Sequence, residues 1–262
     1  MQYRFLVASD LDGTLLPTPD AGLEPGLLDW IRACRRAGGL FCPASGRSYP
    51  TLRAVFEDVV PDVVFLAENG ALAYQNDRLL YSIAMPRELC RQLVADIDAL
   101  PECEARVNTS VGCYFFPKPE DLIRSRRPRG VAGGHPVHRF DEIEGEITKI
   151  SAFCADGVDG PAAVLLPRWQ RRIGAAVTGA CWLDFTAAGK GLGLRRLCRL
   201  FDVPPENTIA FGDNYNDVSL LEAAGTAYIM DIACDDLKAR FPNHTSSVLQ
   251  TLRGLEPRLF GR

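Results

Sequence analysis

The feature that most constrains the fold of this chain is a set of short apolar runs in which no polar residues alternate. Runs of this kind are typical of strands buried on both faces, as in a parallel sheet. The five clearest runs cover residues 5–8, 39–42, 63–67, 209–211 and 227–230.

Helical patterns separate these runs. After Pro25, a residue suited to a first helical turn, Leu27, Ile31 and Cys34 fall on one helical face before Gly38 ends the pattern. A second apolar stripe at helical spacing is formed by Leu194, Leu197, Cys198 and Phe201. Strand alternating with helix predicts a doubly wound α/β fold whose Rossmann-like core sheet is mostly parallel.

The middle of the chain departs from this alternation. Residues 71–83 resemble a hairpin around Asn76-Asp77, a helix is expected after Pro86, and residues 117–140 resemble an exposed loop. Alternating strand patterns follow at 107–116 and 147–154. We therefore expect an inserted α+β domain over residues 84–184, and a core domain formed by residues 1–83 and 185–262.

Composition excludes several classes of partner. The net charge of −4 gives no indication of nucleic acid or of an anionic membrane, and no stretch of roughly 18 apolar residues is present to span one. The nine cysteines include no C-x-x-C pair, which is typical of reduced thiols. The N-terminal apolar run is too short for a signal peptide. We expect a soluble cytoplasmic protein; the sequence indicates no particular oligomeric state.

Polar clusters follow three of the predicted strands. Residues 10–14 (Asp-Leu-Asp-Gly-Thr) follow the first, residues 45–47 (Ser-Gly-Arg) the second, and residues 212–217 (Gly-Asp-Asn-Tyr-Asn-Asp) the fourth. In open α/β sheets, ligands bind beyond the carboxyl ends of the strands. The three clusters are therefore expected to converge on one edge of the sheet.

These residue types suit the transfer of a phosphoryl group. A phosphate monoester is a dianion, so a carboxylate approaches it only when a cation screens the repulsion. Asp10 and Asp213 offer the oxygen ligands that Mg²⁺ prefers, and Lys190 can neutralise charge on the phosphoryl group. Asp12 can move a proton to the leaving oxygen and from water. Ser45 and the amides around Gly46 can hold phosphate oxygens.

The order of these pieces resembles the haloacid dehalogenase superfamily, and within it the Cof-type phosphatases with a C2 cap domain. The insertion between Ala71 and Lys190 has the size and place of that cap. The matching segments are residues 9–16 (SDLDGTLL), 44–47 (ASGR), 68–71 (ENGA), 189–191 (GKG) and 212–217 (GDNYND).

The resemblance implies an aspartyl-phosphate mechanism on a small phosphorylated metabolite, such as a sugar phosphate or a phosphorylated cofactor precursor. Asp10 would be the nucleophile and Asp12 the acid and base. The expected metal-site residues are Asp10, Asp12 through its backbone carbonyl, Asp213 and Asp217. Asp217 would orient Lys190 or a metal-bound water. The expected substrate- and phosphate-binding residues are Thr14, Ser45, Gly46, Lys190 and Asn216.

Ordinary structural roles compete with these functional ones. A calcium loop starting at Asp10 is excluded because its twelfth position is Ala21 rather than Glu. Asp213 and Asp217 could be helix-capping acids, Ser45 an N-cap and Lys190 a solvated helix start. Remaining candidates with weaker patterns are Arg47, Asn69, Lys149, the arginines at 124, 126, 127 and 129, and the histidines at 135 and 138.

Three other functions stay open from the sequence. A phosphotransferase or phosphomutase would pass the phosphoryl group from Asp10 to a second hydroxyl. A signalling module would keep the aspartyl phosphate, although Asp12 should hasten its hydrolysis. A sensor of sugar phosphates would bind without turnover.

Overall fold

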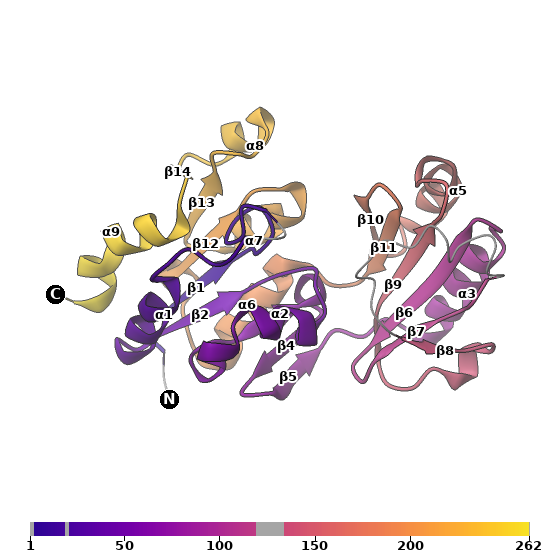
Figure 1. The fold of residues 1–262 in the computed structure, drawn as a ribbon, viewed down its shortest axis with the longest axis horizontal. Helices are drawn as coiled ribbons and strands as arrows, with labels where there is room; N and C mark the ends of the chain where they lie inside the picture. Colours follow the sequence, from indigo (N-terminus) through magenta and orange to yellow (C-terminus); the bar gives the residue numbers. More distant parts are fainter. Residues whose placement is uncertain (1–2, 19–20, 119–133, 262) are drawn as a thin grey trace. The chain divides into compact units, whose positions relative to one another are not determined.

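A computed structural model describes residues 3–18, 21–118 and 134–261 (Figure 1). The chain divides into two compact units, Met1–Tyr81 with Gly189–Arg262, and Ser82–Ala188. These limits lie within four residues of the domain boundaries predicted from the sequence. We call the first the core unit and the second the inserted unit.

The core unit is built on a parallel sheet of five strands in the order β14-β13-β12-β1-β2. Four of the predicted apolar runs form its four longest strands; β1, β2 and β12 are buried along their whole length, and β13 is buried at its carboxyl end. The strands are β1 (Phe5–Ser9), β2 (Gly39–Pro43), β12 (Thr208–Gly212), β13 (Thr226–Met230) and β14 (His244–Thr245).

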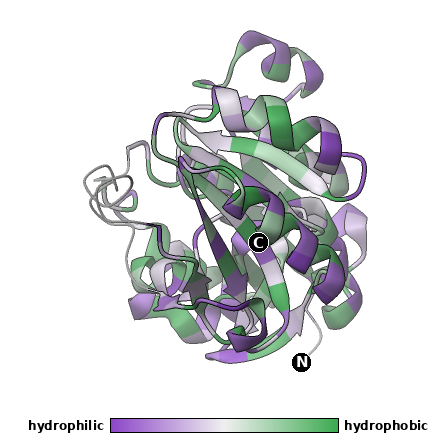
Figure 2. Cartoon of the chain, turned by 90° about the vertical axis from the view of Figure 1, so that its right-hand side faces the viewer, coloured by the Kyte–Doolittle hydropathy of each residue, from purple (hydrophilic) through white to green (hydrophobic). Residues whose placement is uncertain are grey.

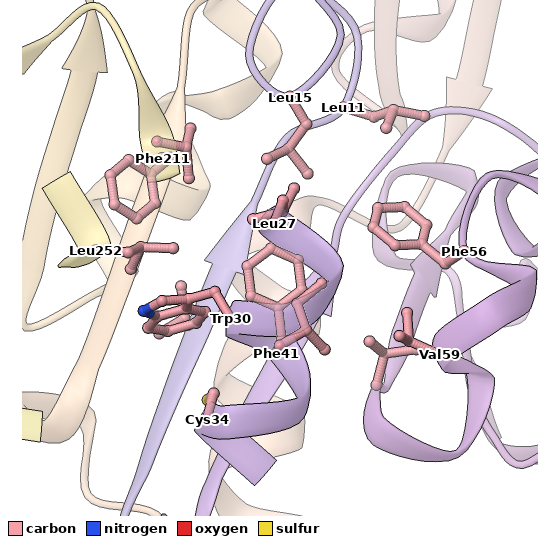
Figure 3. Close-up of a cluster of buried hydrophobic side chains, with 14 of the residues drawn as sticks. Leu11, Leu15, Leu27, Trp30, Cys34, Phe41, Phe56, Val59, Phe211 and Leu252 are labelled. Atoms are coloured by element: carbon pink, nitrogen blue, oxygen red, sulfur yellow. The ribbon is translucent and has the colours of Figure 1, made fainter. Parts of the chain in front are cut away.

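Helices cover both faces of this sheet, so alternate residues of one strand enter different cores. Phe5 and Val7 pack with α1 and α9, whereas Leu6 and Ala8 pack with α6 and α7. Figure 3 shows the first core, where Trp30 of α1 lies against Phe41 of β2. The helices are α1 (Leu27–Arg36), α2 (Tyr49–Val55), α6 (Lys190–Phe201), α7 (Val218–Ala223), α8 (Asp235–Arg240) and α9 (Val248–Phe260). The predicted doubly wound α/β fold is confirmed.

The third apolar run, residues 63–67, lies beside β2 but pairs with the residues there only through isolated bridges. Single bridges join Val63 to Phe41 and Leu66 to Ala44. Its regular part pairs with the predicted hairpin to form a separate sheet in the order β3-β4-β5. These strands are β3 (Phe65–Ala67), β4 (Leu72–Gln75) and β5 (Arg78–Ser82). Short 3₁₀ turns in this unit are Glu57–Asp62, Glu68–Gly70, Pro205–Asn207 and Tyr215–Asp217.

The inserted unit is a six-stranded sheet, ordered β10-β11-β9-β6-β7-β8, that packs against two helices. Figure 2 shows hydrophobic and hydrophilic stripes along the helices of the chain, as expected for helices that cover a sheet. The strands are β6 (Cys103–Thr109), β7 (Cys113–Phe115), β8 (His135–Pro136), β9 (Ile147–Cys154), β10 (Gly174–Gly179) and β11 (Trp182–Thr186). The helices are α3 (Arg87–Asp98) and α5 (Asp159–Trp169), with a 3₁₀ turn at Phe140–Glu142.

Two details of the predicted insertion are wrong. Residues 107–116 form parts of two strands, β6 and β7, which a turn at Ser110–Gly112 separates. Residues 135–136 form strand β8 beside β7 rather than loop, and residues 119–133 of the predicted loop lie outside the described residues. In the described ranges, no helix is both long and apolar enough to cross a membrane.

Candidate active site

The loops after β1 and β12 bring three carboxylates together at the carboxyl edge of the core sheet. Each of Asp10, Asp213 and Asp217 offers one oxygen, and these oxygens all lie within 4.8 Å of one another. Asp10 directly follows β1, and its N–H donates to the Phe211 carbonyl of β12, 3.0 Å away. Within the described ranges, no other set of His, Cys, Asp and Glu side chains is close enough to share a metal.

Lys190 lies inside this cluster as the first residue of α6. Its ammonium donates to Asp10 Oδ1 and, over 2.6 Å, to Asp217 Oδ1. The Lys190 side chain is fully buried, and a buried charge of this kind is stable only when it is paired and hydrogen-bonded. The exposed helix start considered from the sequence is therefore wrong for Lys190.

The loop after β1 turns tightly because of Gly13. Its φ of +94° lies in the left-handed region, and the Gly13 N–H donates to the Leu16 carbonyl, 2.8 Å away. A Cβ at this position would lie 2.8 Å from the carboxyl carbon of Asp213. Glycine therefore allows the loop to approach the acidic cluster closely.

Hydrogen bonds fix the two carboxylates of the later loop. Thr14 Oγ1 donates to Asp213 Oδ1 at 2.8 Å. Asp217 Oδ2 accepts the N–H groups of Asp213 and Asn214, both at 3.1 Å, while its Oδ1 accepts from Lys190. Both oxygens of Asp217 are thus engaged by the protein, which suits the predicted orienting role better than a role as direct metal ligand. Thr14 orients Asp213, and its predicted phosphate contact stays a prediction.

Burial shapes the protonation of the cluster. Burial raises the pKa of Asp10 from 3.8 to about 7, against the opposing attraction of Lys190. Burial also raises the pKa of Asp213. For Lys190, burial acts to lower the pKa, but the carboxylates of Asp10 and Asp217 raise it above its ordinary value. Lys190 therefore stays charged, while Asp10 gains a proton readily unless a further cation lies nearby.

The acidic cluster fits a magnesium ion. When all three carboxylates around the one ammonium are ionised, two negative charges remain in a largely buried place. Asp10 and Asp213 supply hard oxygen donors, which Mg²⁺ prefers. The donor set and its uncompensated charge therefore support the predicted cofactor, with Asp10 and Asp213 as the side chains that would hold it.

The loop after β2 carries the predicted phosphate-binding residues. Ser45 is buried, and its Oγ accepts the Arg47 N–H at 3.1 Å. A turn at Glu68–Gly70 holds this loop: the Asn69 N–H donates to the Ser45 carbonyl and the Glu68 N–H to the Arg47 carbonyl, each at 2.9 Å. The turn's role was not predicted from the sequence, although the Asn69-Gly70 pair is a turn signal.

All three residues of this turn have left-handed backbone, with φ values of +51°, +56° and +85° at Glu68, Asn69 and Gly70. Strain of this kind is often stored beside functional sites. A Cβ at Gly70 would lie 2.9 Å from the Gly189 carbonyl, immediately before Lys190. The turn therefore contacts both the loop after β2 and the start of α6.

The outer predicted residues lie in different surroundings. Asp12 is exposed, and Arg47 binds its carboxylate with two hydrogen bonds. Asn216 is exposed, and its predicted phosphate contact stays a prediction. Lys149 pairs with Asp184 at 3.3 Å, and His135 lies beside the ring of Tyr114. The arginines at 124, 126, 127 and 129 lie outside the described residues.

The doubly wound sheet carries an acidic cluster and a buried lysine at its carboxyl edge, an arrangement suited to phosphoryl transfer. Residues 7–250 match the family described as haloacid dehalogenase-like hydrolase. The chain therefore belongs to that family. This confirms the predicted family and the predicted enzyme class, a phosphatase.

Three similar proteins support this assignment. The 5-amino-6-(5-phospho-D-ribitylamino)uracil phosphatase YbjI of Escherichia coli is 24% identical over 87% of this chain and 85% of its own. The pyridoxal phosphate phosphatase YbhA of the same organism is 26% identical over 94% and 96%. The solved structure of the haloacid dehalogenase subclass IIB sugar phosphatase BT4131 has a TM-score of 0.76 at 20% identity, covering 98% of this chain and 99% of that one. The last shows a shared fold.

Proposed function

We propose that this protein is a Mg²⁺-dependent phosphatase that hydrolyses a small phosphomonoester through an aspartyl phosphate on Asp10. The observation that carries the proposal is the buried contact of Asp10 with Lys190, inside a cluster of three carboxylates. A buried lysine among three acids is typical of a functional site, and this arrangement suits the transfer of a charged phosphoryl group.

In the first step, a carboxylate oxygen of Asp10 attacks the phosphorus, and the bond from phosphorus to the leaving oxygen breaks. Asp12 gives that oxygen a proton. Lys190 lies against Asp10 and stabilises the charge on the equatorial phosphoryl oxygens. A bound Mg²⁺ would be a second cation beside Lys190 and would favour the ionised form of Asp10.

In the second step, water attacks the phosphorus of the aspartyl phosphate. Asp12 accepts a proton from that water, the bond between phosphorus and Asp10 breaks, and inorganic phosphate leaves with Asp10 restored. Ser45 and the amide of Gly46 hold phosphate oxygens through both steps. Asp217 keeps Lys190 in place, because it accepts from the ammonium while two backbone N–H groups fix its other oxygen.

The proposed substrates are sugar phosphates and phosphorylated cofactor precursors. YbjI and YbhA are named for a phosphoribitylamino compound and for pyridoxal phosphate, both small phosphorylated molecules. We propose the inserted unit as the cap that selects the leaving group, since the chain returns from it to the core at Gly189, one residue before Lys190. A cytoplasmic location belongs to the proposal and is supported by nine free cysteines.

The test is a panel of hexose phosphates, pentose phosphates and pyridoxal phosphate, scored by released phosphate with Mg²⁺ and with excess chelator. Phosphoserine and phosphotyrosine peptides serve as a comparison. We expect hydrolysis of at least one small phosphate, its loss on chelation, and near-background rates for Asp10→Asn. Full activity of Asp10→Asn, or a tenfold preference for a peptide, would contradict the proposal. An added acceptor alcohol that captures the phosphoryl group would identify a phosphotransferase instead.

A further inference from the structure

Arg47 and Asp12 form a two-pronged ion pair across two loops of the core unit. Arg47 Nε donates to Asp12 Oδ2 at 3.0 Å, and Nη2 donates to Asp12 Oδ1 at 2.5 Å. Both oxygens of the carboxylate therefore face the guanidinium. The side chains are 25% and 44% exposed, so the pair lies at the rim of the site, where either partner can move.

The backbone of Arg47 belongs to the loop after β2, which is proposed to hold the phosphate. Its N–H donates to Ser45 Oγ at 3.1 Å, and its carbonyl accepts the Glu68 N–H at 2.9 Å. The Cα of Arg47 is thus fixed beside the residues proposed to hold the phosphate. The guanidinium reaches Asp12 from this anchor, which is two residues from Ser45 and bonded to its hydroxyl.

This pairing conflicts with the proposed task of Asp12. A carboxylate whose two oxygens accept from one guanidinium is held as an ion-pair partner and not aimed at a leaving group. A phosphate monoester carries more charge and more acceptor oxygens than a carboxylate, and the planar fork of arginine matches both groups. A bound phosphate therefore competes with Asp12 for the same cation.

We propose that Arg47 is a substrate-binding residue that exchanges partners: it holds Asp12 in the free enzyme and turns to the phosphate oxygens when substrate binds, which releases Asp12 to move protons. This inference rests on the proposed function and adds to it a specific phosphate ligand and a coupling between two residues. The exchange also means that Asp12 and phosphate compete for Arg47.

Competition of this kind has a thermodynamic signature. Removing the charge of Asp12 should tighten phosphate binding for two reasons, the loss of general repulsion and the release of Arg47. Only the second reason depends on Arg47. A double-mutant cycle of Arg47→Gln and Asp12→Asn separates them, because the general repulsion cancels in the cycle.

The experiment measures the dissociation constant of inorganic phosphate by calorimetry in the presence of Mg²⁺, together with kcat and KM for the best substrate. The matched control is Arg53→Gln. Arg53 of α2 binds Asp77 of the hairpin turn through the same two nitrogens, at 2.5 and 3.0 Å. Circular dichroism and a thermal melt confirm that each variant is folded.

We expect Arg47→Gln to weaken phosphate binding about tenfold or more and to raise KM in proportion, as the loss of one charge-assisted contact predicts. Asp12→Asn should tighten phosphate binding by several-fold more when Arg47 is present than when it is replaced, on the order of the couplings seen between residues in contact. Arg53→Gln should leave both constants unchanged.

Unchanged phosphate affinity in a folded Arg47→Gln variant would overturn the inference, as would equal effects of Asp12→Asn in both backgrounds. A fall in kcat alone would assign Arg47 the lesser role of positioning Asp12 and would also overturn it. The proposed function fails separately, if the unmodified chain hydrolyses no phosphomonoester on the panel. The double-mutant cycle measures phosphate binding and not turnover, so it tests the inference in either case.

Discussion

The two halves of the candidate site differ in burial: the charged groups of the inner half are buried, and those of the outer half are exposed to solvent. In the inner half, Lys190 is fully buried between Asp10 and Asp217, and each of these groups has several fixed hydrogen bonds. In the outer half, Asp12 and Arg47 form one pair at the surface. Breaking a buried pair leaves an uncompensated charge in a poorly solvated place, whereas water replaces the partner of an exposed one. We therefore expect the inner ion pairs to stay fixed, and the outer pair of Asp12 and Arg47 to exchange partners.

Replacing Lys190 should have the largest effect. Lys190→Met leaves Asp10 and Asp217 without their shared cation, so we expect a loss of about 3–5 kcal/mol of unfolding free energy. Turnover should fall on the order of 10²–10³-fold, because the phosphoryl charge loses a fixed positive group. Urea denaturation and steady-state kinetics measure the two effects.

The matched surface variant for this experiment is Arg53→Gln, which removes an exposed pair with Asp77. It should leave the urea midpoint and turnover unchanged. Equal destabilisation by both variants would mean that burial does not distinguish the two kinds of pair.

The next effect is a pH dependence that only the inner half should produce. The pKa of Asp10 is 3.8 when unperturbed and about 7 in the folded chain. The folded state therefore holds a proton that the unfolded state releases above pH 4, and stability without metal should fall as pH rises from about 4 to about 7. Above pH 7 both states are ionised and this contribution is constant.

Urea midpoints measured across that range without metal test this sign. Asp10→Asn should flatten most of the slope, and Mg²⁺ should restore stability at the alkaline end because it binds the ionised cluster. Stability that stays flat or rises with pH over the same window would show that the folded chain does not raise the pKa of Asp10.

The smallest predicted effect concerns the turn Glu68–Gly70, which contacts both the loop after β2 and the start of α6. Gly70→Ala should cost about 1–2 kcal/mol, because φ is +85° there, and should also displace the Gly189 carbonyl. Turnover should fall by about tenfold as Lys190 shifts. The control is Gly157→Ala. Its φ is +102°, but a Cβ there would lie 3.8 Å from its nearest neighbour, the Ala180 carbonyl oxygen, which is an ordinary contact distance. It should cost similar stability and no activity.

The sequence predicts the core unit well because its signals are local. The buried runs at 5–8 and 209–211 are apolar on both faces, and the acids that follow them come at strand ends. The inserted unit offers weaker signals. Strand β10 is mostly exposed and contains two glycines, and α5 carries Pro161 and Pro167, so neither shows a clear apolar period.

Within the site, the missed features are those that join distant residues. The sequence predicts that Thr14 contacts phosphate, whereas in the structure its hydroxyl donates to Asp213, 199 positions away. Arg47 resembles a peripheral residue until the fold places Asp12 before its guanidinium. Residue type and spacing do not encode such pairings, since they depend on how loops from different strands meet.

The central claim is that Asp10 carries the phosphoryl group, and the most direct measurement is to trap it there. Asp12→Ala keeps the nucleophile and removes the group that activates water, so the phosphoenzyme should accumulate with an activated aryl phosphate and Mg²⁺. Rapid acid quench followed by peptide mass spectrometry locates the modification. The account predicts a phosphoryl group on Asp10 in Asp12→Ala and none in the variant that also carries Asp10→Asn. Sustained turnover with no phosphorylated Asp10, or a phosphoryl group on another residue, would contradict it.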